Sequence, residues 1–287
     1  MMHLFRKKTP APGWNASPQS EIRTAPLGYT LEFALPDTLE ASVCSVVGTR
    51  PDQQDSFRLC PVDAGVAAVV CDGMGGLNNG QLASCAAADV FLEAIAHTPA
   101  DELPEVFAQS LETINEAVCK AAPGGGSTLV GAVISGTQLF FCSVGDSRLY
   151  IFRDGEMVCA TRAHNYGFLL DERLRLGQIS PEEYQQELPR AEALVSYFGA
   201  PVLRLADISR TPIVLQPKDT ILLCSDGLYR SIPDARLQKI ICGYAGSFCT
   251  LAEYLADTAE RLCAQRDNTS VILLRVRAPY QTAETTD

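Results

Sequence analysis

Residues 65–76 read Gly-Val-Ala-Ala-Val-Val-Cys-Asp-Gly-Met-Gly-Gly, and they say more about the fold than any other stretch. Gly65–Asp72 is an almost unbroken apolar run, which is typical of a buried strand. The run ends in an Asp-Gly turn pair. The glycines that follow let the backbone approach a bound ion closely, so that a carbonyl there could serve as a ligand. The stretch therefore predicts a buried strand that presents a carboxylate at its end.

Four more aspartates lie in turns that contain or adjoin Gly or Asn, or that border a predicted strand: Asp55, Asp146, Asp226 and Asp267. Hard divalent cations prefer oxygen ligands, and carboxylates at strand ends can converge without disturbing the core. Two such ions about 3.5–4 Å apart could activate a water and hold a phosphoryl group. A single Asp-Gly is usually only a turn, so the prediction of a metal centre rests on the five aspartates together.

Periodicity predicts an α+β fold in which helices cover sheets from outside. Asp154-Gly155 is a strong signal for a hairpin turn. Helices are predicted over 81–97, 103–120, 166–177, 234–242 and 248–265, with a further helix start at Ser180-Pro181. Strands are predicted over 65–72, 127–134, 138–144, 148–153, 156–161, 220–224 and 269–276.

The ends of the chain differ from its middle in composition and in hydrophobic periodicity. Residues 1–39 contain five prolines and little periodicity, so we interpret them as a tail or linker. Residues 40–277 form one predicted domain, and 278–287 a C-terminal tail. The polar stretch 163–201 inside the domain is long enough to be a flap or lid.

Composition excludes several classes of protein. The 287 residues carry 23 basic and 34 acidic side chains, a net charge of −11, which argues against a nucleic-acid binder. The largely apolar stretch 131–145 is too short to span a bilayer. Eleven cysteines without paired spacing indicate reduced, buried thiols and a cytoplasmic location. His164 is interpreted as a surface or orienting group, because a lone histidine near a lid is seldom catalytic. No histidine is placed to activate a serine nucleophile.

Six motifs, in order, resemble those of the metal-dependent serine/threonine protein phosphatases (PPM, type 2C), particularly the bacterial branch. They are Arg50-x-x-x-Gln54-Asp55, Asp72-Gly73-Met74-Gly75-Gly76, Gly126-Ser127-Thr128, Gly145-Asp146-Ser147-Arg148, Ser225-Asp226-Gly227-Leu228 and Asp267-Asn268-x-Ser270. The resemblance implies a central β-sandwich of two antiparallel sheets flanked by helix pairs, in four layers (α-β-β-α), with a flap insertion. It also implies two core Mn²⁺ or Mg²⁺ ions at one edge of the sandwich, and in bacterial members a third, looser ion.

The resemblance assigns roles by position. Asp72 would bridge both ions, and Gly73 would offer its carbonyl. Asp226 and Asp267 would complete the first ion's ligands, and Asp55 would bind a metal or a metal-coordinated water. Asp146 with Asp226 resembles the pair that holds the third ion. Arg50 would hold the substrate phosphate, Gln54 would lie beside the metals, and Asn268 would orient Asp267 or a neighbouring backbone group.

Two departures from the family pattern bear on the chemistry. Met74 stands where many eukaryotic members have a histidine credited with protonating the leaving group, so a water at the metals or another group must do so. Gln54 stands where some members have glutamate, and its neutral oxygen would hold one metal more weakly.

The resemblance implies a phosphatase that acts on phosphoserine and phosphothreonine in proteins and opposes a serine/threonine kinase, as a cytoplasmic monomer without a membrane span. Two alternatives stay open. One is a catalytically weak or inactive module that binds phosphorylated partners. The other is a stress-pathway phosphatase with one dedicated substrate.

Overall fold

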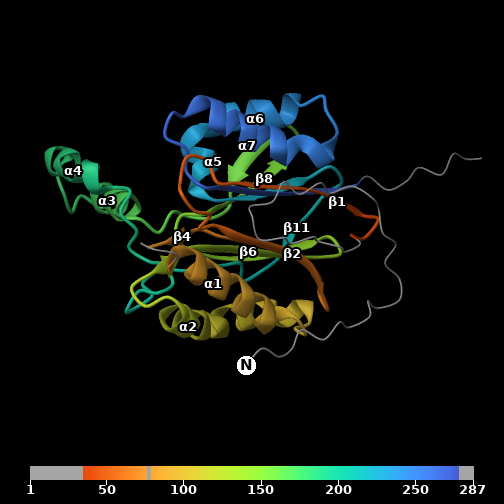
Figure 1. Ribbon diagram of the computed structural model, residues 1–287, viewed down its shortest axis with the longest axis horizontal. Helices are drawn as coiled ribbons and strands as arrows, with labels where there is room; N and C mark the ends of the chain where they lie inside the picture. The colour runs from red at the N-terminus through yellow and green to blue at the C-terminus, as the bar shows by residue number, and fades with distance from the viewer. Residues whose placement is uncertain (1–34, 76–78, 278–287) are drawn as a thin grey trace, which may run out of the picture.

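Two antiparallel sheets stacked face to face form the centre of the computed structural model, which describes residues 35–75 and 79–277 (Figure 1). Residues 1–34 of the predicted N-terminal tail (1–39) and the predicted C-terminal tail, 278–287, lie outside the described residues. Leu39, at the end of the predicted N-terminal tail, already belongs to a strand. The first sheet has the order β1 (Leu39–Val46), β13 (Thr269–Val276), β12 (Thr220–Cys224), β8 (Arg148–Arg153), β9 (Glu156–Cys159). The second has the order β10 (Asp207–Ile208), β7 (Gln138–Val144), β6 (Leu129–Ser135), β3 (Gly65–Cys71), β2 (Ser56–Val62), with β11 (Ile213–Val214) also beside β7.

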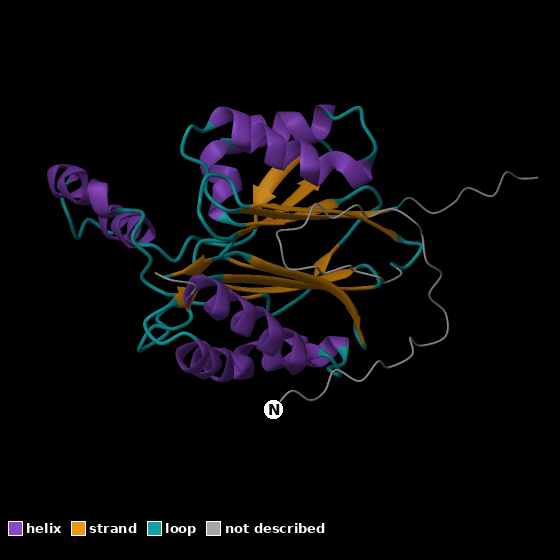
Figure 2. Cartoon of the chain, in the orientation of Figure 1, coloured by secondary structure: helices purple, strands orange, loops and turns teal. Residues whose placement is uncertain are grey.

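Helices cover the outer face of each sheet, as Figure 2 shows. The second sheet is covered by α1 (Asn79–Ile95) and α2 (Leu103–Ala121), which follows the 3₁₀ turn η1 (Ala100–Glu102). The first is covered by α5 (Asp226–Ser231), α6 (Asp234–Gly243) and α7 (Leu251–Leu262), the last preceded by η3 (Phe248–Thr250). This order of layers confirms the predicted α-β-β-α sandwich.

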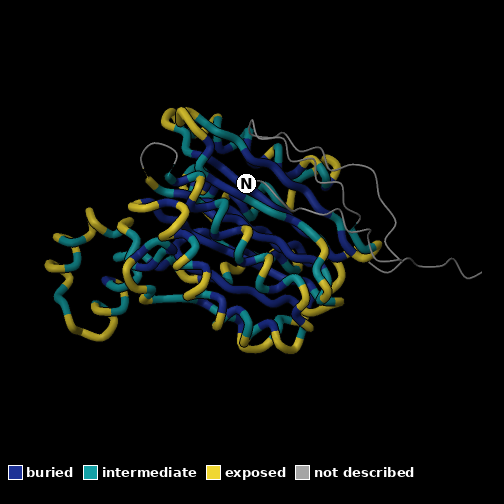
Figure 3. The backbone as a smooth tube through the Cα atoms, turned by 60° about the horizontal axis from the view of Figure 1, so that its bottom comes forward, coloured by how far each residue is buried: buried dark blue, intermediate teal, exposed yellow. Residues whose placement is uncertain are grey.

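Three apolar layers hold the sandwich together, and buried backbone is concentrated in the middle of the molecule (Figure 3). One layer lies between the sheets, and each of the others lies between a sheet and its helices. The small residues Ala83, Ala87 and Ala88 bring α1 close to the second sheet. Burial of this much apolar surface is the main stabilising contribution to the fold.

The predicted flap leaves the body as two short helices, α3 (Tyr166–Arg175) and α4 (Pro181–Glu187), followed by η2 (Leu188–Arg190). They project from one end of the sandwich, at the left of Figure 1. Both starts are capped: the Asn165 side chain accepts the Phe168 N–H, and Ser180 and Glu183 form a reciprocal capping box. No helix in the described ranges is long and apolar enough to cross a membrane.

The strand register brings the predicted aspartate turns to one end of both sheets. In the second sheet, Ser56 at the start of β2 pairs with Cys71 at the end of β3. In the first, Cys224 at the end of β12 pairs with Val271 of β13 and with Arg148 of β8. Antiparallel neighbours place one strand's end beside the next strand's start, so turns far apart in sequence meet in space. The short pair β4 (Gly73–Met74) and β5 (Gly126–Ser127) lies at this end.

Several elements differ from the sequence prediction. The strands β1 and β2 had not been predicted, and α5 begins where only a turn was expected. The helix predicted over 248–265 is a 3₁₀ turn followed by α7, which ends at Leu262. Of the eleven cysteines, four are buried, four are half-buried, and Cys119, Cys159 and Cys242 are exposed. The prediction that the thiols are buried was therefore wrong for these three.

Candidate metal centre

A cavity of about 440 Å³ opens at the end of the sandwich where the aspartate turns meet. Most of its wall is polar, and it combines residues from both sheets, α5 and the flap segment. Its lining residues are Arg50, Pro51, Asp52, Gln54, Asp72, Gly73, Met74, Gly75, Thr128, Asp146, Glu192, Leu194, Asp226, Arg230, Asp267 and Asn268. The structure thus brings together every predicted site residue except Asp55, which lies just behind the wall.

Asp55 is almost fully buried, at 6% exposure. Its Oδ2 accepts a hydrogen bond from the Ser225 hydroxyl at 2.7 Å, whereas its buried Oδ1 has no hydrogen-bond partner. Burial raises the pKa of Asp55 to about 7, and the charges of Asp226 and Asp267 add to the rise. A buried carboxylate oxygen without a partner is costly, and a cation would satisfy it.

Asp72 and Asp226 both line the cavity. Burial, reinforced by Asp55 and Asp226, holds the pKa of Asp72 well above its usual range. Burial likewise raises the pKa of Asp226 to about 6, although Arg230 opposes the rise. Carboxylates that repel one another in this way bind protons or cations tightly.

Asp146 is buried at the base of the same wall, at 4% exposure. Its Oδ2 accepts hydrogen bonds from the Tyr229 hydroxyl at 3.1 Å and from Arg230 Nη2 at 3.3 Å. The turn that carries it requires Gly145, which has φ = 102° and whose missing side chain leaves room for Thr128. Asp146 is therefore fixed in place by a turn that favours glycine and by two donors from α5.

Arg50 lies at the mouth of the cavity, with 58% of its side chain exposed. Its Nη2 donates to Asp267 Oδ2 at 2.7 Å, and this bond raises the pKa of Arg50. The other oxygen of Asp267 accepts the backbone N–H of Asn268. Arg50 is therefore largely exposed and paired to a predicted metal ligand.

Asn268 holds the loop that carries Arg50. Its side-chain amide donates to the carbonyls of Val47 and Asp52, at 2.8 and 3.1 Å, and its Oδ1 accepts the Gln54 N–H at 2.8 Å. Of the two roles left open, the structure gives Asn268 the orientation of backbone groups. The Gln54 carbonyl in turn accepts the Gly73 N–H at 3.2 Å, so Gln54 contributes its backbone to the floor of the site.

The acidic cluster fits a divalent metal pair chemically, because all its donors are oxygens and one buried oxygen is unsatisfied. Within 35–75 and 79–277, no three Asp, Glu, His or Cys side chains already surround a single point as ligands. Two arginines already pair with members of the cluster: Arg50 with Asp267, and Arg230 with Asp226 and Asp146. Neutralisation of the aspartates by cations would release Arg50.

His164 is fully buried outside the cavity, so of its two predicted roles the surface role was wrong and the orienting role fits. Its Nδ1 accepts the Gly145 N–H at 3.1 Å, and its Nε2 lies 3.5 Å from Asp207. It therefore supports the turn that carries Asp146 and does not reach a substrate.

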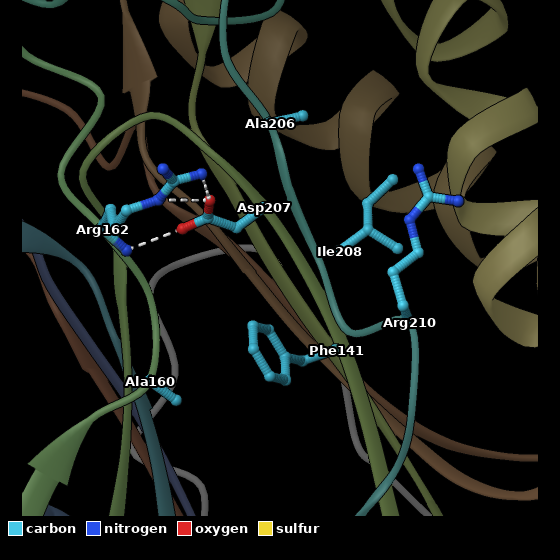
Figure 4. Close-up of a pocket in the computed structure, with 7 residues that line it drawn as sticks. All are labelled: Phe141, Ala160, Arg162, Ala206, Asp207, Ile208 and Arg210. Atoms are coloured by element: carbon cyan, nitrogen blue, oxygen red, sulfur yellow. Dashed lines mark hydrogen bonds and ion pairs between the residues drawn. The ribbon is translucent and has the colours of Figure 1, made fainter.

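A second hollow lies on the far side of Asp207, and Figure 4 shows its lining. Asp207 is paired there with Arg162, while the guanidinium of Arg210 points away from this pair. Its cations do not converge on one point, so it is a weaker candidate for a functional site than the acidic cavity.

Sequence reasoning missed Arg230 and Glu192 in the cavity and Ser225 behind it. Arg230 had a detectable signal, because it follows Asp226 by four residues and helical neighbours four apart can pair. Glu192 had none, because its position depends on how the flap folds back.

Comparison with known proteins identifies the family of the chain. The sequence profile described as Protein phosphatase 2C matches residues 50–268, which span all the aspartates above. The chain belongs to the protein phosphatase 2C family. This result confirms the resemblance seen in the motifs.

Proteins similar to this chain in sequence or in structure support its assignment to the phosphatase 2C family. The serine/threonine phosphatase stp of Listeria innocua is 32% identical over 183 residues, which cover 60% of this chain and 70% of that protein. The solved serine/threonine phosphatase of S. agalactiae is 26% identical, with a TM-score of 0.72 over 83% of this chain and 100% of that one. The catalytic domain of the phosphatase PstP, solved in complex with two manganese ions, shares the fold at 24% identity, with a TM-score of 0.66 over 84% of this chain and 99% of that one.

Proposed function

We propose that this chain is a metal-dependent protein phosphatase that hydrolyses phosphoserine and phosphothreonine in proteins. The observation that carries the proposal is the convergence of Asp72, Asp146, Asp226 and Asp267 in one cavity with an arginine at its mouth. Relatives of the chain are named serine/threonine phosphatase stp and serine/threonine protein phosphatase PstP, and the cavity contains the residue types that this reaction needs.

Two divalent ions would be held by Asp72, the Gly73 carbonyl, Asp226 and Asp267, with Asp55 binding directly or through a water. An all-oxygen set of ligands favours Mn²⁺ or Mg²⁺, and PstP was solved with manganese. When bound, such a pair supplies an activated water and positive charge for attack on a phosphoryl group.

Arg50 would bind the phosphate of the substrate. Its guanidinium offers parallel donors that match phosphate oxygens, and its exposed position at the mouth lets it meet an incoming side chain. Asp267 holds it beside the cavity until the charge of Asp267 is neutralised. Asn268 keeps its loop in register with β13 and the Gly73 turn.

The reaction would balance as a simple hydrolysis. Water oxygen forms a bond to phosphorus, the phosphorus–oxygen bond of the ester breaks, and the serine or threonine oxygen leaves with a proton. Met74 lines the cavity but has no proton to give. Met74 therefore cannot replace a histidine as the donor of the proton to the leaving oxygen. Water in the polar cavity would supply this proton.

The chain retains the features that an inactive binding module would lose, because all the predicted acidic ligands are present and oriented to one end of the sandwich. The finer assignments are also proposals: a single catalytic domain over 40–277, a monomer, an opposing serine/threonine kinase, and a cytoplasmic location that suits eleven free thiols.

The test is hydrolysis of a phosphothreonine and a phosphoserine peptide by the full chain with Mn²⁺, after EDTA, and by the Asp72→Asn variant. We expect activity that EDTA abolishes, that added Mn²⁺ restores, and that Asp72→Asn lacks although the variant folds. Full activity after exhaustive chelation, or normal turnover by Asp72→Asn, would refute the proposal.

A further inference from the structure

Arg230 occupies the outer part of the cavity with contacts to three carboxylates. Helix α5 begins at Asp226, and one turn later Arg230 Nε lies 2.9 Å from Asp226 Oδ2. Its Nη2 lies 3.3 Å from Asp146 Oδ2 and 3.0 Å from Glu192 Oε2 of the flap segment. The guanidinium thus joins α5, the Asp146 turn and the flap.

The surroundings of Arg230 keep it charged and in place. Burial alone would lower the pKa of Arg230, but Asp226, Tyr229 and Asp146 raise it further above its already high value. Tyr229 donates to the same oxygen of Asp146, and the Arg148 guanidinium lies 3.7 Å from the centre of the Tyr229 ring. Only 44% of the Arg230 side chain is exposed.

We infer that Arg230 is a built-in cation at the position of the third metal ion, so that this chain binds a pair of ions and not three. The inference rests on the proposed function, since it concerns the ions of that same centre. The family resemblance implies Asp146 and Asp226 as the ligands of a third ion, but the structure shows both paired to a guanidinium. An added divalent ion between them would lie in contact with Arg230 and be repelled by it.

Among the proposed ligands of the core ions, Arg230 forms its ion pair with Asp226 Oδ2. Asp267 pairs with Arg50 at the mouth and not with Arg230. Asp55 is held from behind by Ser225. Arg230 lies on α5, whose first residue is Asp226. The fold of α5 therefore holds its guanidinium beside Asp146. Loss of its charge should therefore create a third site without removing the other two.

The experiment counts Mn²⁺ bound per chain by equilibrium dialysis at millimolar Mn²⁺, in wild type, Arg230→Asn and Arg261→Asn. Arg261 is a matched control, because it pairs with Asp257 four residues before it on α7, away from the cavity. We expect two ions in wild type and in Arg261→Asn, and a third, weaker ion in Arg230→Asn. The double variant Arg230→Asn/Asp146→Asn should return to two, and Arg230→Lys, which keeps the charge, should also bind two.

Three ions bound by wild type would overturn the inference while leaving the phosphatase proposal intact. The inference would also be overturned if Arg230→Asn bound only two Mn²⁺ ions per chain while unfolding like the wild type. No ion bound by wild type would instead refute the proposed metal centre itself, so the two failures are distinguishable.

Discussion

At the scale of single residues, the cavity is defined by unbalanced charge. Asp55 and Asp72 lie in surroundings that penalise their ionised forms, and the available arginines neutralise other members of the cluster. Such an arrangement is costly for a protein that only folds, and useful for one that binds cations. The aspartates therefore fall into two groups. Asp55 and Asp72 have no arginine partner in this structure, whereas Asp146, Asp226 and Asp267 are each paired with an arginine.

Arg50→Ala tests the proposed contact with the substrate phosphate. We expect KM for a phosphopeptide to rise about 10- to 100-fold, because a charged hydrogen bond contributes about 1.5–3 kcal/mol, and kcat to fall less. Arg50→Lys should not restore KM, since an ammonium cannot reproduce the planar fork. An unchanged KM in metal-loaded Arg50→Ala would limit Arg50 to its pairing with Asp267.

The raised pKa of Asp55 makes the stability of the metal-free protein depend on pH. Its pKa is raised from 3.8 to about 7 by folding, so the folded state holds a proton that the unfolded state releases. Stability should therefore fall as pH rises from about 4 to about 7, by up to a few kcal/mol. Asp207, whose pKa is lowered, stays ionised across this range and does not offset the fall.

Urea unfolding of the metal-free protein between pH 5 and pH 8 measures this effect, with Asp55→Asn as the matched variant. The variant should lose less stability over the same range, because it has no proton to release. Equal pH slopes for the two proteins would show that Asp55 does not titrate as described.

At the scale of elements, the site is formed by strand ends and by the backbone packed behind them. Gly73 illustrates this: a Cβ there would overlap the carbonyl oxygens of Gly80 on α1 and of Gln54. Three segments of main chain meet at this point, and they place the Gly73 carbonyl beside Asp72. The first turn of α1 and the Arg50 loop are thus packed against the predicted ligand.

Gly73→Ala should destabilise the protein by about 2 kcal/mol or more, because backbone atoms on both sides cannot rotate away. Gly243→Ala is the control, since Gly243 ends α6 with open space around its Cβ position, and its effect should stay within about 1 kcal/mol. Chemical denaturation measures both. A small effect of Gly73→Ala would show that the three segments can separate at little cost.

The elements also show what the sequence could predict. The strands β7, β8, β12 and β13 have the predicted bounds because their apolar runs are flanked by clear turn residues. The strand β2 was missed because Arg58 and Pro61 interrupt its apolar pattern, and β1 because Glu40 and its serines do so. Its pairing with β13 over eight residues, and not its own composition, makes β1 a strand.

The candidate site was predictable to a similar degree. The aspartates were found because each lies in a recognisable turn, and the family resemblance supplied their order. The pairing of Arg230 with Asp146 could not be predicted, since it depends on the approach of α5 to the β7–β8 turn. The contact with Glu192 depends in addition on how the flap folds over the cavity.

At the scale of the whole molecule, the residues that stabilise the sandwich and the residues of the candidate site lie in different parts of the fold. The three apolar layers stabilise the body, while the acidic residues are gathered at one end with the flap beside them (Figure 1). Ends of sheets can change their turns without disturbing the layers behind them. Two cations at this end would therefore reduce repulsion locally and leave the rest of the fold as it is.

The most direct test of the central claim is a crystal structure of the chain grown with Mn²⁺, with anomalous scattering measured at the manganese edge. We predict two peaks in the acidic cavity, about 3.5–4 Å apart, with Asp72 bridging them and Arg50 released from Asp267. A cavity without anomalous peaks at saturating Mn²⁺, or peaks that Asp72 does not touch, would contradict the account.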